Sequence, residues 1–199
     1  MGDMRYRAEI TAGALKVSES RVVADLLLRG VSAQEWRQAI YEDNRLLTHS
    51  LKTAQRLSAL IRGRLSLVEA PLWQLIRDGS MKEATHACLA ATVKASPLVG
   101  DFLDWVVRDA YRTFKETLAP ALWTDYLTDC RGRDPAMPRW NESTIHRLRS
   151  SVYLILAEAG YLDSTQTRTL QTVHIVEPVL RYLEQHDEHY VLRCLQVGP

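Results

Sequence analysis

Apolar residues recur along most of this chain at the three- and four-residue spacing that is typical of amphipathic helices. A serine stands three residues before a glutamate at Ser32 and at Ser80, and this capping-box pattern marks the start of a helix. Glycines and prolines separate the periodic stretches. The third predicted helix can be interrupted near Thr48 or Gly63. The spacing predicts helices over residues 18–29, 32–43, 44–68, 71–78, 80–95, 97–114, 120–130, 141–160 and 178–194.

One stretch breaks the helical pattern and indicates a domain boundary. Residues 131–140, RGRDPAMPRW, contain two prolines, a glycine and several charged residues. We therefore predict an N-terminal domain over residues 1–130, built as a helical bundle, and a C-terminal helical domain over residues 131–199. Residues 165–176 are the only stretch with strand character, because they contain four threonines and alternate in part.

The predicted fold is a mainly α, compact multi-helix protein whose C-terminal part carries a small β element after a turn at Gly160. A helical core with such an element is winged-helix-like, and winged helices bind duplex DNA with phosphate contacts that position the module. A helical hairpin with a stabilising pair of strands has the same sequence pattern, so both interpretations stay open.

Composition indicates an ordinary globular protein. The chain has 199 residues, of which 46% are hydrophobic and 25% charged, so it can bury a core without a metal or a disulfide. Cys88, Cys130 and Cys194 are an odd number without a CxxC motif, which fits reduced thiols in the cytoplasm. No apolar run approaches the roughly 18–20 residues that span a bilayer, and the N-terminus lacks the apolar core of a signal peptide. We expect a cytoplasmic protein without a membrane partner.

The net charge is +1, but its distribution is uneven. Residues 44–68 contain five Lys or Arg and no acid. At about 100° per residue, one group of these cations falls opposite the apolar stripe and two fall beside it. Such a row can follow a phosphate backbone and release condensed counterions, although an ordinary solvated helix face has the same pattern. The candidate DNA-binding residues of this row are Arg45, Lys52, Arg56, Arg62 and Arg64.

A second basic group follows the predicted boundary. Five arginines between residues 131 and 149 are offset only by Asp134 and Glu142. From this group we take Arg139, Arg147 and Arg149 as further candidates for DNA binding.

The first two predicted helices, joined by residues 28–32, are helix-turn-helix-like. However, the spacing of Gly30 differs from the usual one, and the second helix offers Gln34, Gln38 and Glu42 rather than an arginine-rich face. We interpret this pair as packing geometry.

The sequence offers no motif for catalysis or for a cofactor. Neither GxxxxGKS/T nor GxGxxG occurs, and no short motif places a nucleophile beside a base. His186 and His189 share a helix face, which we interpret as a solvated surface because further ligands would be needed for a metal. We therefore predict no enzyme, no catalytic residue, no metal site and no cofactor.

Several segments follow one another in a characteristic order: Tyr6, ITAGALKVSESRVVADLLLRGVSAQEW, NRLLTHSLKTAQRLSALIRGRL, LWQLIRDGS, LVGDFLDWVVRDAY and WNESTIHRLRSSVYLILAEAGYLD. This series covers nearly the whole chain without a large insertion, and it resembles the BrxA family of bacterial BREX phage-defence systems. The resemblance implies a small, mainly helical, cytosolic core component encoded beside a methyltransferase, an ATPase, a phosphatase-like protein and a protease-like protein.

The resemblance also implies DNA binding without enzymatic activity, in a system that distinguishes methylated host DNA from unmodified phage DNA. It supplies no residue-level contact motif, so the candidate residues rest on charge alone. The leading hypothesis is a non-enzymatic, DNA-binding core component whose partners are double-stranded DNA and other BREX proteins. An assembly adaptor whose basic face meets an acidic protein is the alternative. A nuclease or other enzyme would require metal-dependent turnover.

Overall fold

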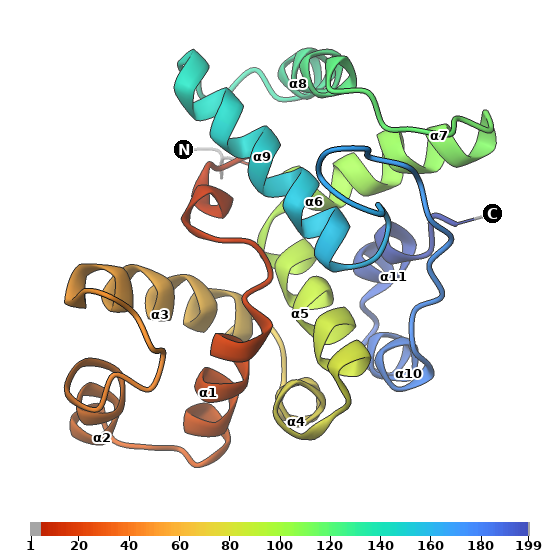
Figure 1. Cartoon of the computed structure of the whole chain (residues 1–199). Coiled ribbons are helices and arrows are strands. Elements are labelled where there is room, and N and C mark those ends of the chain that lie inside the picture. The colour runs from red at the N-terminus through yellow and green to blue at the C-terminus, as the bar shows by residue number, and fades with distance from the viewer. Residues whose placement is uncertain (1–4, 199) are drawn as a thin grey trace.

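The computed structural model describes residues 5–198, in which every regular element is a helix (Figure 1). A 3-10 helix, η1 (Glu9–Ala12), comes first, and two π-helical turns, η2 (Gln38–Glu42) and η3 (Phe102–Val107), extend α2 and join α6 to α7. The mainly α prediction is confirmed. The α-helices are α1 (Val17–Leu28), α2 (Ala33–Arg37), α3 (Leu51–Leu65), α4 (Ala70–Asp78), α5 (Met81–Ala95), α6 (Pro97–Asp101), α7 (Arg108–Arg112), α8 (Ala121–Arg133), α9 (Glu142–Glu158), α10 (Glu177–Gln185) and α11 (His189–Leu195).

Both predicted capping boxes form. The Ser32 Oγ accepts a hydrogen bond from the Glu35 N–H at 3.3 Å, and the Glu35 carboxylate accepts one from the Ser32 N–H at 2.8 Å. Ser80 and Glu83 make the same reciprocal pair at the start of α5. Each box satisfies backbone donors that a helix N-terminus leaves unpaired, which is why the sequence places these two starts correctly.

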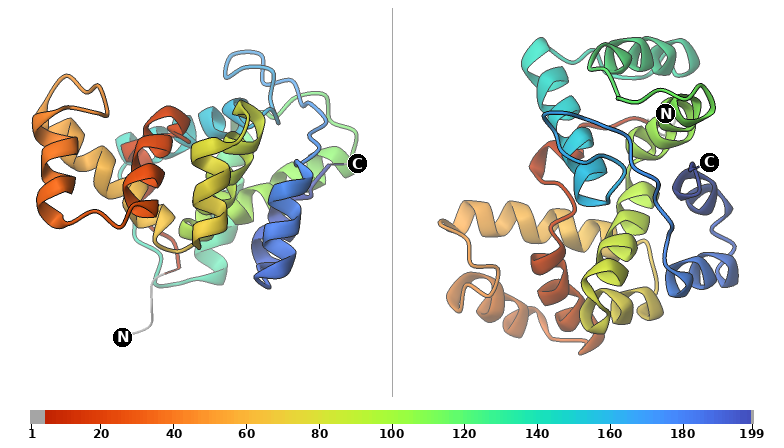
Figure 2. Two further views of the ribbon diagram at one scale, coloured as in Figure 1. Left: turned by 90° about the horizontal axis from the view of Figure 1, so that it is seen from below. Right: turned by 45° about the vertical axis from the view of Figure 1, so that its right-hand side comes forward.

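Helix α5 lies at the centre of the fold. Its residues 86–93 are all buried, and α1, α3, α4, α6, α10 and α11 pack around it (Figures 1 and 2). Ala87, Ala90 and Ala91 have small side chains that let the neighbouring helices approach closely. A helix that is buried on all sides gains stability from every one of these contacts, because burial of apolar area is the main favourable contribution to folding.

One buried cluster includes side chains from both predicted domains. It extends from Tyr6 in the N-terminal segment to Val197 near the C-terminus. Helix α10 also packs against α4 and α5, and α11 packs against α5 and η3. The predicted boundary falls at the end of α8 and in the loop before α9. The described residues therefore share one core, and the division into domains 1–130 and 131–199 stays a prediction.

Residues 165–176 form no strand in the described chain; only two isolated antiparallel bridges occur in this region. The backbone N–H groups of this region donate hydrogen bonds to nearby side chains instead. The Asp163 carboxylate accepts from the Thr169 N–H at 2.8 Å, and the Ser164 Oγ accepts from the Thr167 N–H at 3.1 Å. Such local contacts compete with the ladder of a sheet. The predicted small β element, and with it the winged-helix-like C-terminal part, was wrong.

Helix α3 begins at Leu51 rather than at the predicted Asn44. Asn44 and Leu47 adopt left-handed backbone conformations, with φ of 47° and 51°. The Asn44 side-chain carbonyl accepts from the Thr48 N–H at 2.9 Å, and the Ser50 side chain then caps α3. Local side-chain bonds therefore replace helical bonds over residues 44–50.

None of the helices within residues 5–198 combines the length and the apolar character needed to cross a bilayer. The longest of them, α9, buries Leu148, Val152 and Ile155 along one face and exposes polar residues on the other. This pattern is that of a helix that packs on one side against a protein core.

Candidate nucleic-acid interface

Helix α3 has one buried apolar face and one exposed polar face, as its sequence predicts. Ala54, Leu57, Ile61 and Leu65 are buried against η1, α1 and α5. Their three- and four-residue spacing places them on one side of the helix. The opposite side is therefore directed toward solvent, and it carries the basic residues of interest.

Lys52 and Arg56 lie one turn apart on this exposed side. Neither side chain forms a hydrogen bond or an ion pair with any residue from 5 to 198. Because no carboxylate within that range neutralises them, both charges are available to an anion from outside the molecule.

Arg62 is also exposed, and an aromatic ring positions it. Its guanidinium carbon lies 4.7 Å from the centroid of the Trp36 ring, which α2 supplies. A cation over the face of an aromatic ring is attracted by the ring quadrupole, and the charge stays accessible from its other side. The Trp36 ring itself is only half-buried.

Arg64 is buried and does not belong to the exposed row. Its Nη1 donates to the Ala14 carbonyl at 2.6 Å and its Nη2 to the Gly13 carbonyl at 3.1 Å. Burial lowers the pKa of the guanidinium to about 10. The predicted phosphate contact by Arg64 fails because the N-terminal segment covers this side of α3, which the helix pattern alone does not show.

Arg45 lies in the loop before α3, not on the helix. Its guanidinium is 3.5 Å from the Asp25 carboxylate, which also pairs with Arg29 at 3.6 Å and Arg77 at 3.8 Å. The predicted alignment of Arg45 with Lys52 fails because the helix starts later, at Leu51.

A groove of about 660 Å³ runs between α3 and the N-terminal segment. Arg56 and Gly63 line it from α3, and Arg7 and Glu9 line it from the other side. Arg64 also lines the groove, and Arg7 lies 3.7 Å from Glu9, so one of the three groove arginines has an acidic neighbour. Sequence reasoning missed Arg7. The charge of Arg7 is evident from the sequence, but its position opposite α3 depends on tertiary packing.

The second predicted basic group divides. Arg139, before α9, and Arg147, in its first turns, are exposed, and the Arg147 Nε donates to the Ser143 carbonyl at 3.3 Å. Arg149 is half-buried and lines a separate pocket against the loop that contains Arg168. Residues two positions apart in a helix are rotated by about 200° around its axis, so the side chains of Arg147 and Arg149 face opposite sides.

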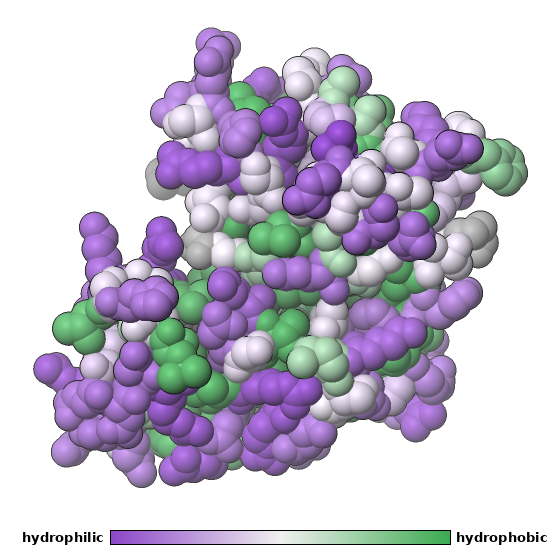
Figure 3. Space-filling model, viewed as in Figure 1, coloured by the Kyte–Doolittle hydropathy of each residue, from purple (hydrophilic) through white to green (hydrophobic). Residues whose placement is uncertain are grey.

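The two basic helices lie on one side of the molecule. Figure 1 shows α3 and the first turns of α9 on the left, and η1 packs against both helices. Hydrophilic side chains project from this edge in Figure 3, above and below a hollow. The helices that carry the two basic groups therefore lie on one side of the molecule, with η1 packed against both. Arg149, however, faces away from Arg147 into a separate pocket.

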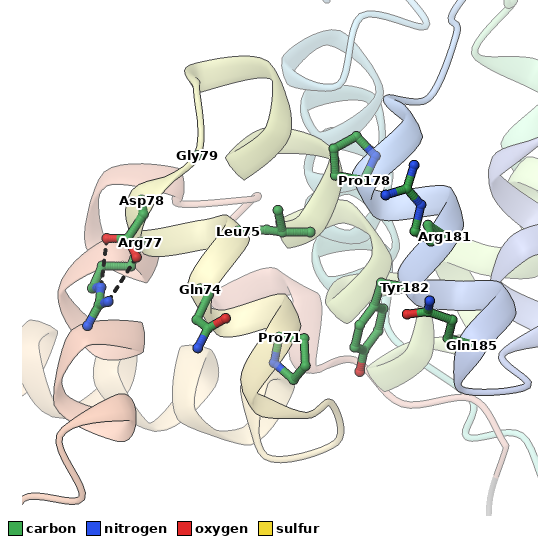
Figure 4. A pocket seen from close by; sticks show the side chains of 10 residues that line it. All are labelled: Pro71, Gln74, Leu75, Arg77, Asp78, Gly79, Pro178, Arg181, Tyr182 and Gln185. Carbon is green, nitrogen blue, oxygen red and sulfur yellow. Dashed lines mark hydrogen bonds and ion pairs between the residues drawn. The ribbon is translucent and has the colours of Figure 1, made fainter.

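The pocket between α4 and α10 is a weaker candidate for an anion site (Figure 4). It has a volume of about 540 Å³ and contains Arg77 and Arg181. Arg77 points toward Asp78, whose carboxylate it contacts at 2.8 Å, and Arg181 pairs with Glu177 at 3.3 Å. Because each cation already has a carboxylate partner, little net positive charge remains for a ligand.

Residues 5–198 contain no group of three or more His, Cys, Asp or Glu side chains that could hold a metal ion. His186 stacks on the Tyr182 ring at 4.2 Å, and its Nδ1 lies 2.8 Å from the Tyr182 carbonyl oxygen. His189 is exposed beside Asp187 at 3.7 Å.

Comparison with known proteins gives a consistent result. The family model described as BrxA matches residues 4–187. A BREX protein BrxA of Paramagnetospirillum magneticum (strain ATCC 700264 / AMB-1) is 47% identical over 198 residues, which cover 100% of both chains. A BREX protein BrxA of Escherichia coli O9:H4 (strain HS) is 35% identical over 188 residues, covering 93% of this chain and 88% of the relative.

The fold is similar to one seen by crystallography. The crystal structure of an uncharacterized protein from Magnetospirillum magneticum has a TM-score of 0.91 and 46% sequence identity, and the match covers 98% of this chain and 100% of that one. The match of the family model and the high identity over full length agree: this chain belongs to the BrxA family.

Proposed function

We propose that this chain is a component of a BREX phage-defence system that binds double-stranded DNA and catalyses no reaction itself. Membership of the BrxA family supports the BREX assignment, since relatives named BREX protein BrxA match it over most of their length. Other BREX proteins are the expected protein partners.

The exposed and unpaired side chains of Lys52 and Arg56 are the observation that carries the DNA-binding proposal. A rigid helix holds both charges one turn apart, so they can contact phosphates without a large loss of conformational freedom. Each cation that neutralises a phosphate releases condensed counterions, which favours binding and makes it salt-dependent. Contacts of this kind position a protein on DNA and carry no sequence information directly.

Further cations on the same side extend this surface. Arg62 over Trp36 continues it along α3, and Arg139 and Arg147 add contacts near the start of α9. The other three predicted residues are not proposed to contact DNA. Arg45 is paired with an acid, Arg64 is buried, and Arg149 lies in a separate pocket.

A charge-reversal experiment tests this proposal. Lys52→Glu combined with Arg56→Glu should weaken duplex binding at least about tenfold in a gel-shift titration, because two attractive contacts become repulsive. The matched control is Lys82→Glu with Arg112→Glu. These cations, on α5 and α7, are also exposed and unpaired among residues 5–198, and their reversal changes the net charge equally. Equal weakening in both double variants, or none in either, would contradict the proposal; circular dichroism checks that both variants fold.

A second function, protein–protein assembly, is favoured by two leucines next to the basic row. Leu47 is 85% exposed and Leu51 is 61% exposed. Exposed apolar side chains rimmed by polar residues are typical of protein contacts. An adaptor would co-purify with a BREX subunit and would show no salt-sensitive duplex binding. Leu47→Ser with Leu51→Ser would then abolish the co-purification.

A further inference from the structure

A pocket of about 530 Å³ lies between α9 and the loop of residues 163–168, apart from the basic side chains of α3. Helix α9 contributes one arginine, a serine, a tyrosine and a leucine, and the loop contributes a threonine, a glutamine and a second arginine. None of the described residues that line it is acidic. Its lining is Pro120, Arg149, Ser150, Tyr153, Leu154, Thr165, Gln166 and Arg168.

Both arginines line this pocket together with Tyr153. The Tyr153 hydroxyl donates to the Ala119 carbonyl at 3.0 Å, so its position is fixed. Burial raises the pKa of this phenol to about 12, and the charges of Arg168 and Arg149 both act on it in the opposite direction. Both guanidinium groups therefore lie within electrostatic reach of the Tyr153 hydroxyl.

The Asp163 carboxylate, in the same loop, forms no ion pair with Arg149 or Arg168 and binds neutral donors instead. The Asp163 carboxylate accepts hydrogen bonds from the Ser164 N–H at 2.6 Å, the Thr167 hydroxyl at 2.6 Å and the Thr169 N–H at 2.8 Å. Arg149 forms no hydrogen bond or ion pair with any residue from 5 to 198. A half-buried arginine without a protein partner can form charge-assisted hydrogen bonds with an anionic ligand.

The second arginine is held in place before any ligand arrives. Arg168 has a φ of 55°, a left-handed conformation that is uncommon for residues other than glycine. Its N–H donates to the Ser164 carbonyl at 3.2 Å, its carbonyl accepts from the Leu118 N–H at 3.0 Å, and its Nη1 donates to the Thr165 carbonyl at 3.2 Å. Because bonds on both sides pin this loop, little entropy would be lost when a ligand binds.

The remainder of the lining suits a planar ring with polar edges. Pro120 and Leu154 provide apolar surface, and Leu154 is 43% exposed. The Gln166 side-chain amide forms no hydrogen bond within the described chain, so it can donate to or accept from a ligand. The volume is within the range of small-molecule pockets and far larger than one phosphate needs.

We propose that this pocket binds a nucleotide, with Arg149 and Arg168 on the phosphate and with Pro120 and Leu154 against the base. Guanidinium groups match phosphate oxygens bidentately, and two of them suit the double negative charge of a phosphate monoester. Duplex binding by α3 is not required for this site. The nucleotide could be free or could be the phosphorylated end of a strand, and the chemistry of recognition is the same.

Calorimetric titration of the full chain with AMP, adenosine and inorganic phosphate tests the proposal. We expect AMP to bind at least about tenfold more tightly than either part, because charge and ring contacts combine. Arg149→Ala should weaken AMP binding at least about tenfold, and Arg149→Lys should weaken it less, because the charge remains while the fork is lost. The matched control is Arg112→Ala: Arg112 is an exposed arginine on α7 that does not line this pocket, and its removal should leave AMP affinity within about twofold.

A 5′-phosphorylated trinucleotide distinguishes the two sources of ligand. Tighter binding of AMP indicates a free nucleotide, and tighter binding of the trinucleotide indicates a strand end; either result supports the site. No binding of AMP or of the trinucleotide at millimolar concentration would overturn the proposal. Equal affinity of AMP and adenosine, or unchanged AMP affinity in a folded Arg149→Ala variant, would overturn it as well.

Discussion

The hydroxyl of Tyr190, in α11, donates a 2.8 Å hydrogen bond to the carboxylate of Asp101, the last residue of α6. The Tyr6 hydroxyl donates to the same carboxylate at 2.8 Å, and the Arg5 guanidinium contacts it at 2.9 Å. Asp101 is 1% exposed, so these partners replace the water that a buried charge loses. The carboxylate thereby ties the N-terminal segment and α11 to the centre of the fold.

Asp101→Ala should lower the free energy of unfolding by about 2–4 kcal/mol, because the tyrosine hydroxyls lose their acceptor and Arg5 loses its partner. Urea titration followed by circular dichroism measures this change. Asp125→Ala is the matched control. Asp125 is exposed on α8, so its removal should cost less than about 0.5 kcal/mol. Equal urea midpoints for the two variants would contradict the role of Asp101.

Gly100 permits the contact between α6 and Tyr190. A Cβ at this position would collide with the Tyr190 hydroxyl oxygen, so Gly100→Ala should destabilise the protein by about 1–3 kcal/mol. At Gly63, inside α3, an added Cβ would meet nothing within 4 Å. Gly63→Ala should therefore raise the free energy of unfolding by about 0.5–1 kcal/mol through helix propensity. Thermal unfolding of both variants checks the opposite signs, and a shift in the same direction would count against this packing.

His86 should make the stability depend on pH. It is buried in α5, and its Nδ1 accepts from the Val176 N–H at 3.1 Å. Burial, with a smaller contribution from the charge of Lys82, lowers the pKa of the imidazole from 6.5 to about 4. Between pH 6.5 and about pH 4, His86 is therefore protonated in the unfolded chain but neutral in the folded chain. Stability is full above pH 6.5 and falls toward pH 4, by at most about 3 kcal/mol.

His86→Asn retains an acceptor near the Nδ1 position but does not titrate. Urea midpoints measured from pH 7 to pH 4 should decline less steeply in this variant than in the wild type. Parallel curves would show that other groups, such as the carboxylates, account for the whole dependence.

Arg62 and Arg64 are two residues apart but should respond in different ways. Arg64→Met removes two hydrogen bonds to backbone carbonyls and should cost about 1–3 kcal/mol of stability, with unchanged duplex affinity of the folded protein. Arg62→Met should keep stability within about 1 kcal/mol and weaken duplex binding about threefold or more. Urea titration and fluorescence anisotropy on both variants separate the two roles. Weaker binding by Arg64→Met at an unchanged urea midpoint would argue against its structural role.

The helices were predictable wherever local signals determine them. The capping boxes at Ser32 and Ser80 and the apolar face of α9 depend on residues close together in sequence. The strand prediction over residues 165–176 failed because threonine content indicates β propensity but not the presence of a partner strand. The side chain of Asp163, just before that stretch, binds its backbone instead.

The candidate site was predictable in part. Lys52 and Arg56 lie on the exposed face that the helical spacing indicates. Arg64 could not be placed from its own helix, because the N-terminal segment that covers it comes from far away in the chain. The sequence alone could have predicted that Arg147 and Arg149 face opposite sides of α9, because residues two positions apart in a helix are rotated by about 200°.

The dependence of duplex affinity on salt tests the DNA-binding account most directly. Affinities of the wild type, of Lys52→Ala with Arg56→Ala, and of Lys82→Ala with Arg112→Ala would be measured between about 50 and 200 mM salt. The account predicts that the slope of log K against log salt becomes shallower by about 1.8 in the α3 variant, since each lost phosphate contact removes about 0.9. The control variant should keep the wild-type slope. A wild-type slope in the α3 variant, or no duplex binding by the wild type at the lowest salt, would contradict the account.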